Sequence, residues 1–219
     1  MRMGDGGGQA AVRIRVDAGL IPGGSERLKR QVEFLLEIDR LKHTLRRTIL
    51  TDRSRQENSV EHSWHIATAA LVMSEHAGHA GIDLCRALRM MLIHDLVEID
   101  AGDTYCYDEQ GRLDQGEREL SGAERIFGML PESQAAELRG LWDEFEERAT
   151  PEAHFAHAMD RFQAFLHNYV TEGEVWRRNG IRREQVLARM QPLAVGAPVL
   201  WEYVKTLIDD AVAKGYLKG

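Results

Sequence analysis

The chain has 219 residues, of which 43% are hydrophobic and 29% charged, and its formal net charge is -7 at pH 7. This composition is typical of a soluble globular protein, and the length suits one domain around a single sizeable core. The acidic balance argues against a broad surface for nucleic-acid polymers, because such a surface needs many Lys and Arg contacts to phosphate. A small anionic ligand held by a few basic residues is compatible with it.

Membrane, secretory and thiolate-metal classes are also disfavoured. No stretch approaches the roughly 18 to 20 apolar residues of a membrane span, and the N-terminus lacks the apolar core of a secretory signal. We therefore expect a cytoplasmic protein with no membrane partner. Cys85 and Cys106 are the two cysteines, and no Cys-x-x-Cys occurs, so any metal must be bound by histidine and carboxylate groups.

The N-terminal part predicts a tail followed by a helix. Residues 1–24 are rich in glycine and are expected to form a loose tail, with a short extended piece at residues 11–16. Ser25 is expected to cap a helix over residues 25–45, which carries apolar residues at helical spacing. Basic residues at its end, including Arg46 and Arg47, either complement the helix dipole or bind an anion.

A second helix is expected to lie centrally in the fold. Residues 51–58 are polar and predict a loop, after which Ser59 is expected to cap a helix reaching residue 76. This helix has little polar face, which indicates a central, buried position. It carries His62 and His65. For His65, a hydrogen-bonded core position is a more ordinary interpretation than a metal ligand.

The stretch at residues 91–104 carries one imidazole and four carboxylates directly after an apolar helical run. Asp83 is expected to cap this third helix and Gly102 to end it. On a helix, His94, Asp95 and Glu98 would project from one side, because they are three and four residues apart. We expect a metal ion as their common target.

The remaining chain also predicts helices. Residues 105–116 are polar and contain glycine, which predicts a loop long enough to act as a flap. Helices are expected at residues 117–130, from residue 131, at 150–171, at 182–190 and at 199–214. Thr150 followed by Pro151 is a strong start signal for the 150–171 helix, in which Asp160 lies among apolar residues. A buried carboxylate is costly, so Asp160 must be paired, protonated or bound to a metal.

The predicted fold is all-α, with about seven or eight helices in one domain over residues 25–219, because alternating strand patterns and tight hairpin signals are missing. The four tryptophans are expected in the core or in a subunit contact rather than as platforms for a base: Trp64, Trp142, Trp176 and Trp201. Apolar residues of the last helix form either core or a dimer face: Val199, Leu200, Tyr203, Leu207 and Ile208.

The order of the candidate side chains resembles that of the HD-domain metal-dependent phosphohydrolases. Four motifs make it similar to the subgroup that contains the bacterial and eukaryotic 5'-deoxynucleotidases: Glu61-His62-Ser63, His94-Asp95-x-x-Glu98, Gly102-Asp103 and Asp160-Arg161. The resemblance covers residues 27–169, most of the chain. A lone His-Asp pair would be weak evidence, whereas the ordered set is specific.

The resemblance implies that His62, His94, Asp95 and Asp160 bind one divalent cation. Two imidazoles and two carboxylates suit Mn, Co, Fe, Ni or Zn, whereas Mg prefers more oxygen ligands. Four protein ligands in an octahedral site leave two positions for water and substrate.

Two more carboxylates and a basic pair complete the implied site. Glu98 is the candidate for orienting or deprotonating water, although it could instead pair with a core arginine. Asp103 either protonates the leaving alkoxide or fixes the sugar, or it caps the turn after Gly102. Arg46, with Arg47 as the alternative, matches the family's substrate-binding arginine. Ile49 stands where the family has the tryptophan that helps to select deoxyribose.

We therefore expect a divalent-metal-dependent phosphohydrolase that cleaves a phosphomonoester, foremost a nucleoside (deoxy) 5'-monophosphate. Two alternatives stay open. One is an HD phosphohydrolase acting on another small phosphate compound, such as a guanosine tetraphosphate alarmone. The other is a metal protein that senses a nucleotide without turnover, against which Glu98 and Asp103 argue. The resemblance also favours a homodimer.

Overall fold

The computed structural model describes residues 23–219. The tail expected at residues 1–24, including its extended piece at 11–16, lies outside the described residues apart from Gly23 and Gly24. The helices are α1 (Glu26–Glu37), α2 (Ser59–Met73), α3 (Leu84–Ile93), α4 (Glu98–Ala101), α5 (Gln115–Gly128), α6 (Glu132–Glu147), α7 (Pro151–Val170), α8 (Glu174–Arg178), α9 (Arg183–Met190), α10 (Leu193–Gly196) and α11 (Pro198–Ala213). Three 3-10 segments, η2 (Ile38–His43), η3 (Ser74–His76) and η4 (His94–Val97), and two strands, β1 (Leu45–Ile49) and β2 (Gln56–Asn58), complete the described chain.

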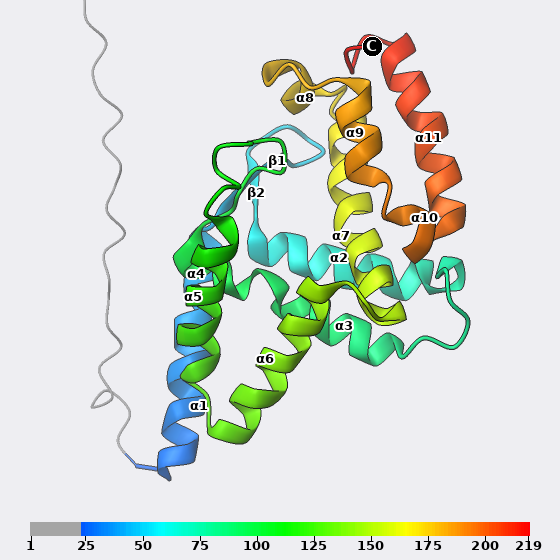
Figure 1. The fold of residues 1–219 in the computed structure, drawn as a ribbon. Helices are drawn as coiled ribbons and strands as arrows, with labels where there is room; N and C mark the ends of the chain where they lie inside the picture. Colours follow the sequence, from blue (N-terminus) through cyan, green and yellow to red (C-terminus); the bar gives the residue numbers. More distant parts are fainter. Residues whose placement is uncertain (1–22) are drawn as a thin grey trace, which may run out of the picture.

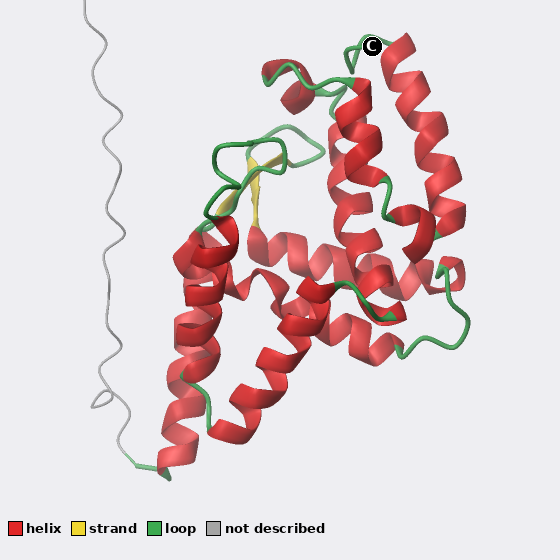
Figure 2. Cartoon of the chain, viewed as in Figure 1, coloured by secondary structure: helices red, strands yellow, loops and turns green. Residues whose placement is uncertain are grey.

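The all-α prediction is confirmed. Over the described residues, eight helices are eight residues or longer, and the three others are single turns or little more. Figure 2 shows how small the strand content is. No helix in this part of the chain is long and apolar enough to cross a bilayer.

Helix α7 is the central element of the fold. It contacts α2 and α3 on one side and α10 and α11 on another, and α3 also packs against α6. In Figure 1, α1, α4 and α5 lie together at one end of the molecule, while α9, α10 and α11 lie at the other. The N-cap predicted for α7 is present, because the Thr150 side chain accepts from the Ala153 N–H at 3.2 Å. Buried polar residues gather on this helix: His157, Asp160, Arg161, Gln163 and His167.

The first predicted helix is too long. Ser25 caps it as expected, but α1 ends at Glu37, and the chain continues as η2 and then as β1. Ion pairs from Arg40 to Glu37 and from Lys42 to Asp39 span three residues, the spacing at which side chains of a 3-10 helix eclipse. The following residues pair with another strand instead of closing helical hydrogen bonds.

The sequence lacks hairpin signals, yet one short hairpin forms at this point. β1 pairs antiparallel with β2, with Leu45 opposite Asn58, so part of the expected loop at residues 51–58 is a strand. The β-branched residues Thr48 and Ile49 suit the extended backbone, and both are buried. A single short hairpin packed on helices needs little alternation of apolar and polar residues, so the sequence pattern does not reveal it.

The third predicted helix is interrupted. α3 ends at Ile93, η4 follows, and α4 ends before Gly102. The φ angle of Gly102 is 73°, a positive value that favours glycine because it has no Cβ. His94 and Asp95 therefore lie on a 3-10 turn, and the helical spacing used to group them with Glu98 does not hold. All three nevertheless line one pocket.

The tryptophans and the last helix divide between core and surface. Trp142 and Trp176 are buried and Trp201 packs against the core, whereas Trp64 is 65% exposed, so a core position for Trp64 is wrong. On α11, Leu200 and Ile208 are buried and belong to the core. Val199 and Tyr203 are exposed, so a dimer face stays open as an alternative for these two residues.

Candidate active site

Four candidate metal ligands converge from three elements. His62 comes from α2, His94 and Asp95 from η4, and Asp160 from α7, and all four are buried. His62 Nε2 lies 3.0 Å from Asp160 Oδ1, and His94 Nε2 lies 2.9 Å from Asp95 Oδ1. One ligand atom each of His62, His94 and Asp160 falls within 4.8 Å of the others. The structure thus brings together residues separated by nearly 100 positions in sequence.

This arrangement fits a divalent ion. Ligands bonded at about 2.1 Å in an octahedral site lie about 3 Å apart along an edge, which matches both distances above. His94 Nδ1 faces the Met91 carbonyl at 2.9 Å, so it carries the hydrogen and leaves an Nε2 lone pair for the cluster. That Nε2 atom is buried, and among the described residues Asp95 Oδ1 lies near it at 2.9 Å without completing a well-aligned hydrogen bond.

The cluster also attracts positive charge. Burial disfavours the charged form of His94, but Asp95 and Asp160 outweigh it and raise the pKa of His94 to about 9. Burial likewise opposes ionisation of Asp95, yet His94 and Arg46 lower its pKa to about 2. A proton on His94 therefore balances part of the carboxylate charge. A divalent ion would replace that proton.

Arg46 points into this cluster from β1. Its Nη1 lies 3.0 Å from Asp95 Oδ2 and 3.8 Å from Asp103 Oδ1, and its Nη2 lies 3.9 Å from Asp160 Oδ1. Burial disfavours its charge, but these carboxylates raise the pKa of Arg46 further above its usual value. Arg46 is therefore held in the site as a permanent cation. Arg47 is exposed, and it lines a pocket next to this cluster.

Glu98 and Asp103 are both placed at the cluster. Glu98 is buried, and its Oε2 accepts a 2.7 Å hydrogen bond from Ser59 Oγ. Burial, followed by the negative charge of Asp95, raises the pKa of Glu98 well above its usual value. Burial also raises the pKa of Asp103, against the opposing charge of Arg46. Both groups are thus shifted towards holding a proton.

Two pockets meet at the cluster. The carboxylate pocket is lined by His94, Asp95 and Glu98 and by residues of α5 and α6. The aromatic pocket is lined by Tyr105, Tyr107, Phe165 and Trp176 among others. Seven residues line both: Arg46, Asp103, Thr104, Cys106, Asp160, Arg161 and Arg189. The loop predicted as a flap thus contributes walls to both pockets.

Two of the cations on this shared wall received no role from the sequence. Arg161 is 4% exposed, and its Nε and Nη1 atoms are buried without a hydrogen-bond partner among residues 23–219. Burial and the nearby charge of Arg189 lower the pKa of Arg161 to about 10. The sequence did carry a signal for Arg161, because a charged residue inside the long apolar stretch of this helix needs a partner if it is buried. For Arg189, on α9, the sequence carried no such signal.

Comparisons with known proteins identify the family of the chain. The family model described as HD domain matches residues 38–201, a range that holds all four candidate ligands. The chain is 29% identical over 136 residues to 5'-deoxynucleotidase HDDC2 of Bos taurus and 27% identical over the same length to that of Homo sapiens. These matches cover 62% of this chain but only 64% and 65% of the two relatives, less than two thirds of their length.

Solved structures show the same fold. A predicted metal-dependent phosphohydrolase from Magnetospirillum magnetotacticum is 49% identical, with a TM-score of 0.85, over 88% of this chain and 96% of that one. A conserved hypothetical protein from Pyrococcus furiosus matches at 21% identity and a TM-score of 0.56, over 83% of this chain and 99% of that one. With the family model matched over most of its length, the chain belongs to the HD domain family.

Proposed function

We propose that this chain is a divalent-metal-dependent phosphohydrolase that cleaves a phosphomonoester, with a nucleoside 5'-monophosphate as substrate. The observation that carries the proposal is the meeting of the His62, His94, Asp95 and Asp160 cluster with a wall that holds Arg46, Arg161 and Arg189. Phosphate carries negative charge into a site already rich in carboxylates, so both features are needed. The names of the relatives, 5'-deoxynucleotidase and metal-dependent phosphohydrolase, support the same class.

The protein groups divide the chemical work. His62, His94, Asp95 and Asp160 would hold Mn, Co, Fe, Ni or Zn, and an ion bound there supplies charge that acidifies water and polarises a phosphoryl oxygen. Glu98 in its carboxylate form takes a proton from the attacking water, and its raised pKa makes the carboxylate a stronger base than an exposed one. Asp103, also raised in pKa, gives a proton to the leaving alkoxide or fixes the sugar.

Arg46 and Arg161 bind the phosphoryl group. Arg46 lies among the ligand carboxylates, and Arg161 offers unpaired N–H groups on the wall shared by the two pockets. A phosphate oxygen would satisfy those donors, which otherwise leave an uncompensated buried charge.

The aromatic pocket receives the nucleoside. It adjoins the shared wall, so a phosphate at the cluster places its ester group towards Tyr105, Tyr107 and Trp176. Ile49, at the position of the family tryptophan, lines neither of the two pockets. The proposal therefore covers ribose and deoxyribose nucleotides alike.

A substrate panel and one variant test the proposal. Nucleoside 5'- and 3'-monophosphates of both sugars and guanosine tetraphosphate are assayed for hydrolysis with Mn or Co, beside metal analysis of the purified protein. We expect phosphate release from 5'-monophosphates, and loss of both metal and activity in Asp95→Ala. Full activity and metal content in Asp95→Ala would refute the site. Turnover of the tetraphosphate alone would refute the substrate class, and tight nucleotide binding without turnover at any metal would favour a sensor.

A homodimer in the cytoplasm completes the proposal. The exposed apolar side chains of Trp64, Val199 and Tyr203 give candidate contact surface. Sedimentation equilibrium at micromolar concentration tests the assembly, and a monomer mass would contradict it.

A further inference from the structure

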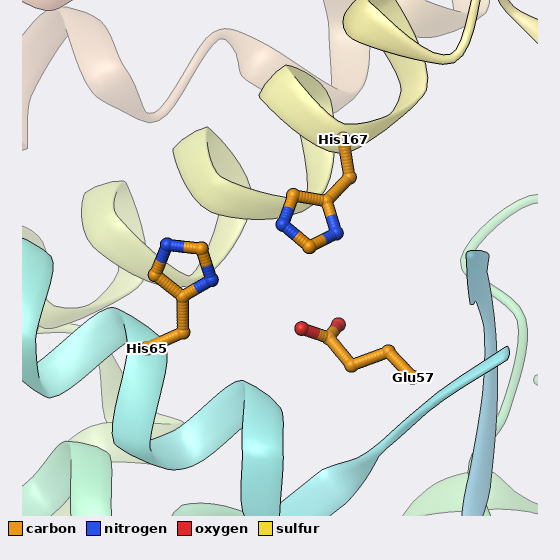
Figure 3. Close-up of side chains that lie close together, drawn as sticks. All are labelled: Glu57, His65 and His167. Atoms are coloured by element: carbon orange, nitrogen blue, oxygen red, sulfur yellow. The ribbon is translucent and has the colours of Figure 1, made fainter. Parts of the chain in front are cut away.

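A second group of metal-type donors lies beside the candidate active site. Glu57 of β2, His65 of α2 and His167 of α7 turn their side chains towards one another, as Figure 3 shows. One ligand atom from each falls within 4.8 Å of the others. By donor chemistry alone, two imidazoles and a carboxylate suit a metal ion.

The amide of Gln163 holds the space among these donors. Its Nε2 lies 2.7 Å from Glu57 Oε1, 3.2 Å from His65 Nδ1 and 3.1 Å from His167 Nε2. These are hydrogen-bond lengths to all three candidate ligand residues. An ion at that point would have to expel the amide, so the geometry favours a hydrogen-bond network over a second metal.

The direction of this network follows from a backbone carbonyl. His167 Nδ1 lies 3.2 Å from the Ile49 carbonyl oxygen, which only accepts, so Nδ1 carries the hydrogen and Nε2 presents a lone pair. The amide group of Gln163 that faces this lone pair and the Glu57 carboxylate must therefore be the NH2. In the reversed orientation its oxygen would face a carboxylate and two ring nitrogens, and the hydrogen bonds to Glu57 and His167 would be lost.

The amide oxygen then determines the state of His62. Gln163 Oε1 lies 2.9 Å from His62 Nδ1, so Nδ1 donates to it. His62 Nε2, 3.0 Å from Asp160 Oδ1, is left for the metal cluster. Metal-binding histidines in general donate their second ring N–H to such a partner, which fixes both the tautomer and the ring orientation.

We propose that Gln163 is a positioning residue that holds His62 with Nε2 directed to the metal, and that Glu57 and His167 hold Gln163 in turn. The proposal rests on the proposed function, in which His62 is a ligand. Burial supports it, since His62 is 0%, Glu57 1% and Gln163 2% exposed, so no bulk water competes for these hydrogen bonds. Gln163 follows Asp160 by three residues on α7, so one side of the helix presents both the ligand and the group that orients its neighbour.

The test uses Gln163→Met, which keeps the length of the side chain and removes its hydrogen bonds. We expect the Co(II) dissociation constant, measured by competition with a chelator, to rise about 10- to 100-fold. Gln134→Met is the matched control, because it removes an amide contact to Gln31 of 2.7 Å outside the site. It should leave the constant unchanged.

Two further measurements separate positioning from general damage. In zinc-loaded protein labelled with 15N-histidine, the His62 Nδ1–H proton should be observable in the wild type and lost in Gln163→Met, while thermal melts of the metal-free proteins verify folding. Metal titration should give one ion per chain, both in the wild type and in His65→Ala.

The outcomes are distinct. If the wild type binds no divalent ion, the proposed function fails and this inference fails with it. If the wild type binds one ion, but Gln163→Met retains both the affinity and the His62 proton signal, only the positioning role is refuted. Two ions per wild-type chain, with one lost in His65→Ala, would show that the Glu57, His65 and His167 group is a metal site after all.

Discussion

Replacing Glu98 by glutamine removes its basicity while keeping its shape. Glu98 accepts a 2.7 Å hydrogen bond from Ser59 Oγ, and the glutamine amide oxygen can accept the same bond. None of the four candidate ligands is altered, so metal binding should be unchanged. The substitution therefore isolates the proposed transfer of a proton from water.

The expected loss is large and confined to turnover. A positioned general base contributes about 10²- to 10⁴-fold, so kcat should fall by that factor, or about 3 to 5 kcal/mol of transition-state stabilisation. KM should change little, since Glu98 is not proposed to bind the substrate phosphate. The free energy of unfolding of the metal-free protein should rise in Glu98→Gln, while kcat falls.

The sign of the stability effect follows from the raised pKa of Glu98, which burial and Asp95 together cause. A carboxyl group that binds its proton more tightly in the folded state costs stability as pH rises above its unfolded pKa. The amide in Glu98→Gln escapes this cost. The metal-free variant should therefore be more stable than the wild type at pH 7, and the difference should shrink below pH of about 4.

The assay compares Glu98→Gln with Glu119→Gln. Glu119 lines the same pocket and also has a pKa raised by burial, but it accepts from Gln115 and has no proposed role in the reaction. Initial rates at saturating Mn, metal content and urea denaturation are measured for both. We expect Glu119→Gln to keep kcat within a few-fold. Loss of metal in Glu98→Gln would mean that Glu98 is a ligand, and an unchanged kcat would refute its role as the base.

Three further predictions concern the charged groups around the site. Arg161→Met should raise KM about 10- to 100-fold, because a charged hydrogen bond to the substrate phosphate is lost. The metal-free fold should not be destabilised, since Nε and Nη1 of Arg161 have no hydrogen-bond partner among the described residues. A destabilised variant with a normal KM would contradict this prediction. Burial lowers the pKa of His157 to about 3. The contribution of neutral His157 to stability is therefore fully present above its unfolded pKa of about 6.5 and is lost as pH falls. Between pH 7 and 5, the free energy of unfolding from urea titrations should fall by about 2 kcal/mol less in His157→Gln than in the wild type. Equal decreases in both proteins would refute the burial of His157 as a neutral group. Removing metal with a chelator should lower Tm by about 5 to 10 °C and abolish hydrolysis, with both restored by Mn or Co; an unchanged Tm at saturating metal would exclude tight binding.

Part of the candidate site could be proposed from local signals in the sequence. Thr150 and Pro151 start α7, and the apolar spacing that follows shows that Asp160 must be buried. A buried carboxylate requires a partner, and His94 with Asp95 after an apolar helix raises the same requirement. Buried charge thus singled out Asp160 and the His94-Asp95 pair, whereas His62 and the full ligand set came from the resemblance to the HD-domain phosphohydrolases.

The hairpin was not predictable in this way. Glu57 lies in a polar stretch whose composition is typical of a surface loop, yet it is 1% exposed. Its burial depends on pairing with β1 and on hydrogen bonding to Gln163, 106 positions away. No local pattern encodes a contact of that kind, because the cost of burying Glu57 is offset only after the distant elements have packed.

The sequence of helix α7 does indicate such long-range contacts, through its buried polar residues. His157, Arg161, Gln163 and His167 interrupt its apolar sequence, and each is buried. Polar residues in a helix that must be buried need partners from other elements, since burying them alone costs more than most helices can offset. Sequence can therefore reveal that such residues have a role, while the backbone carbonyl, carboxylate and imidazole that complete each contact appear only in three dimensions. For Gln163, the distinction between an inert core amide and a group that orients a metal ligand depends on one atom, the Oε1 that accepts from His62 Nδ1 at 2.9 Å.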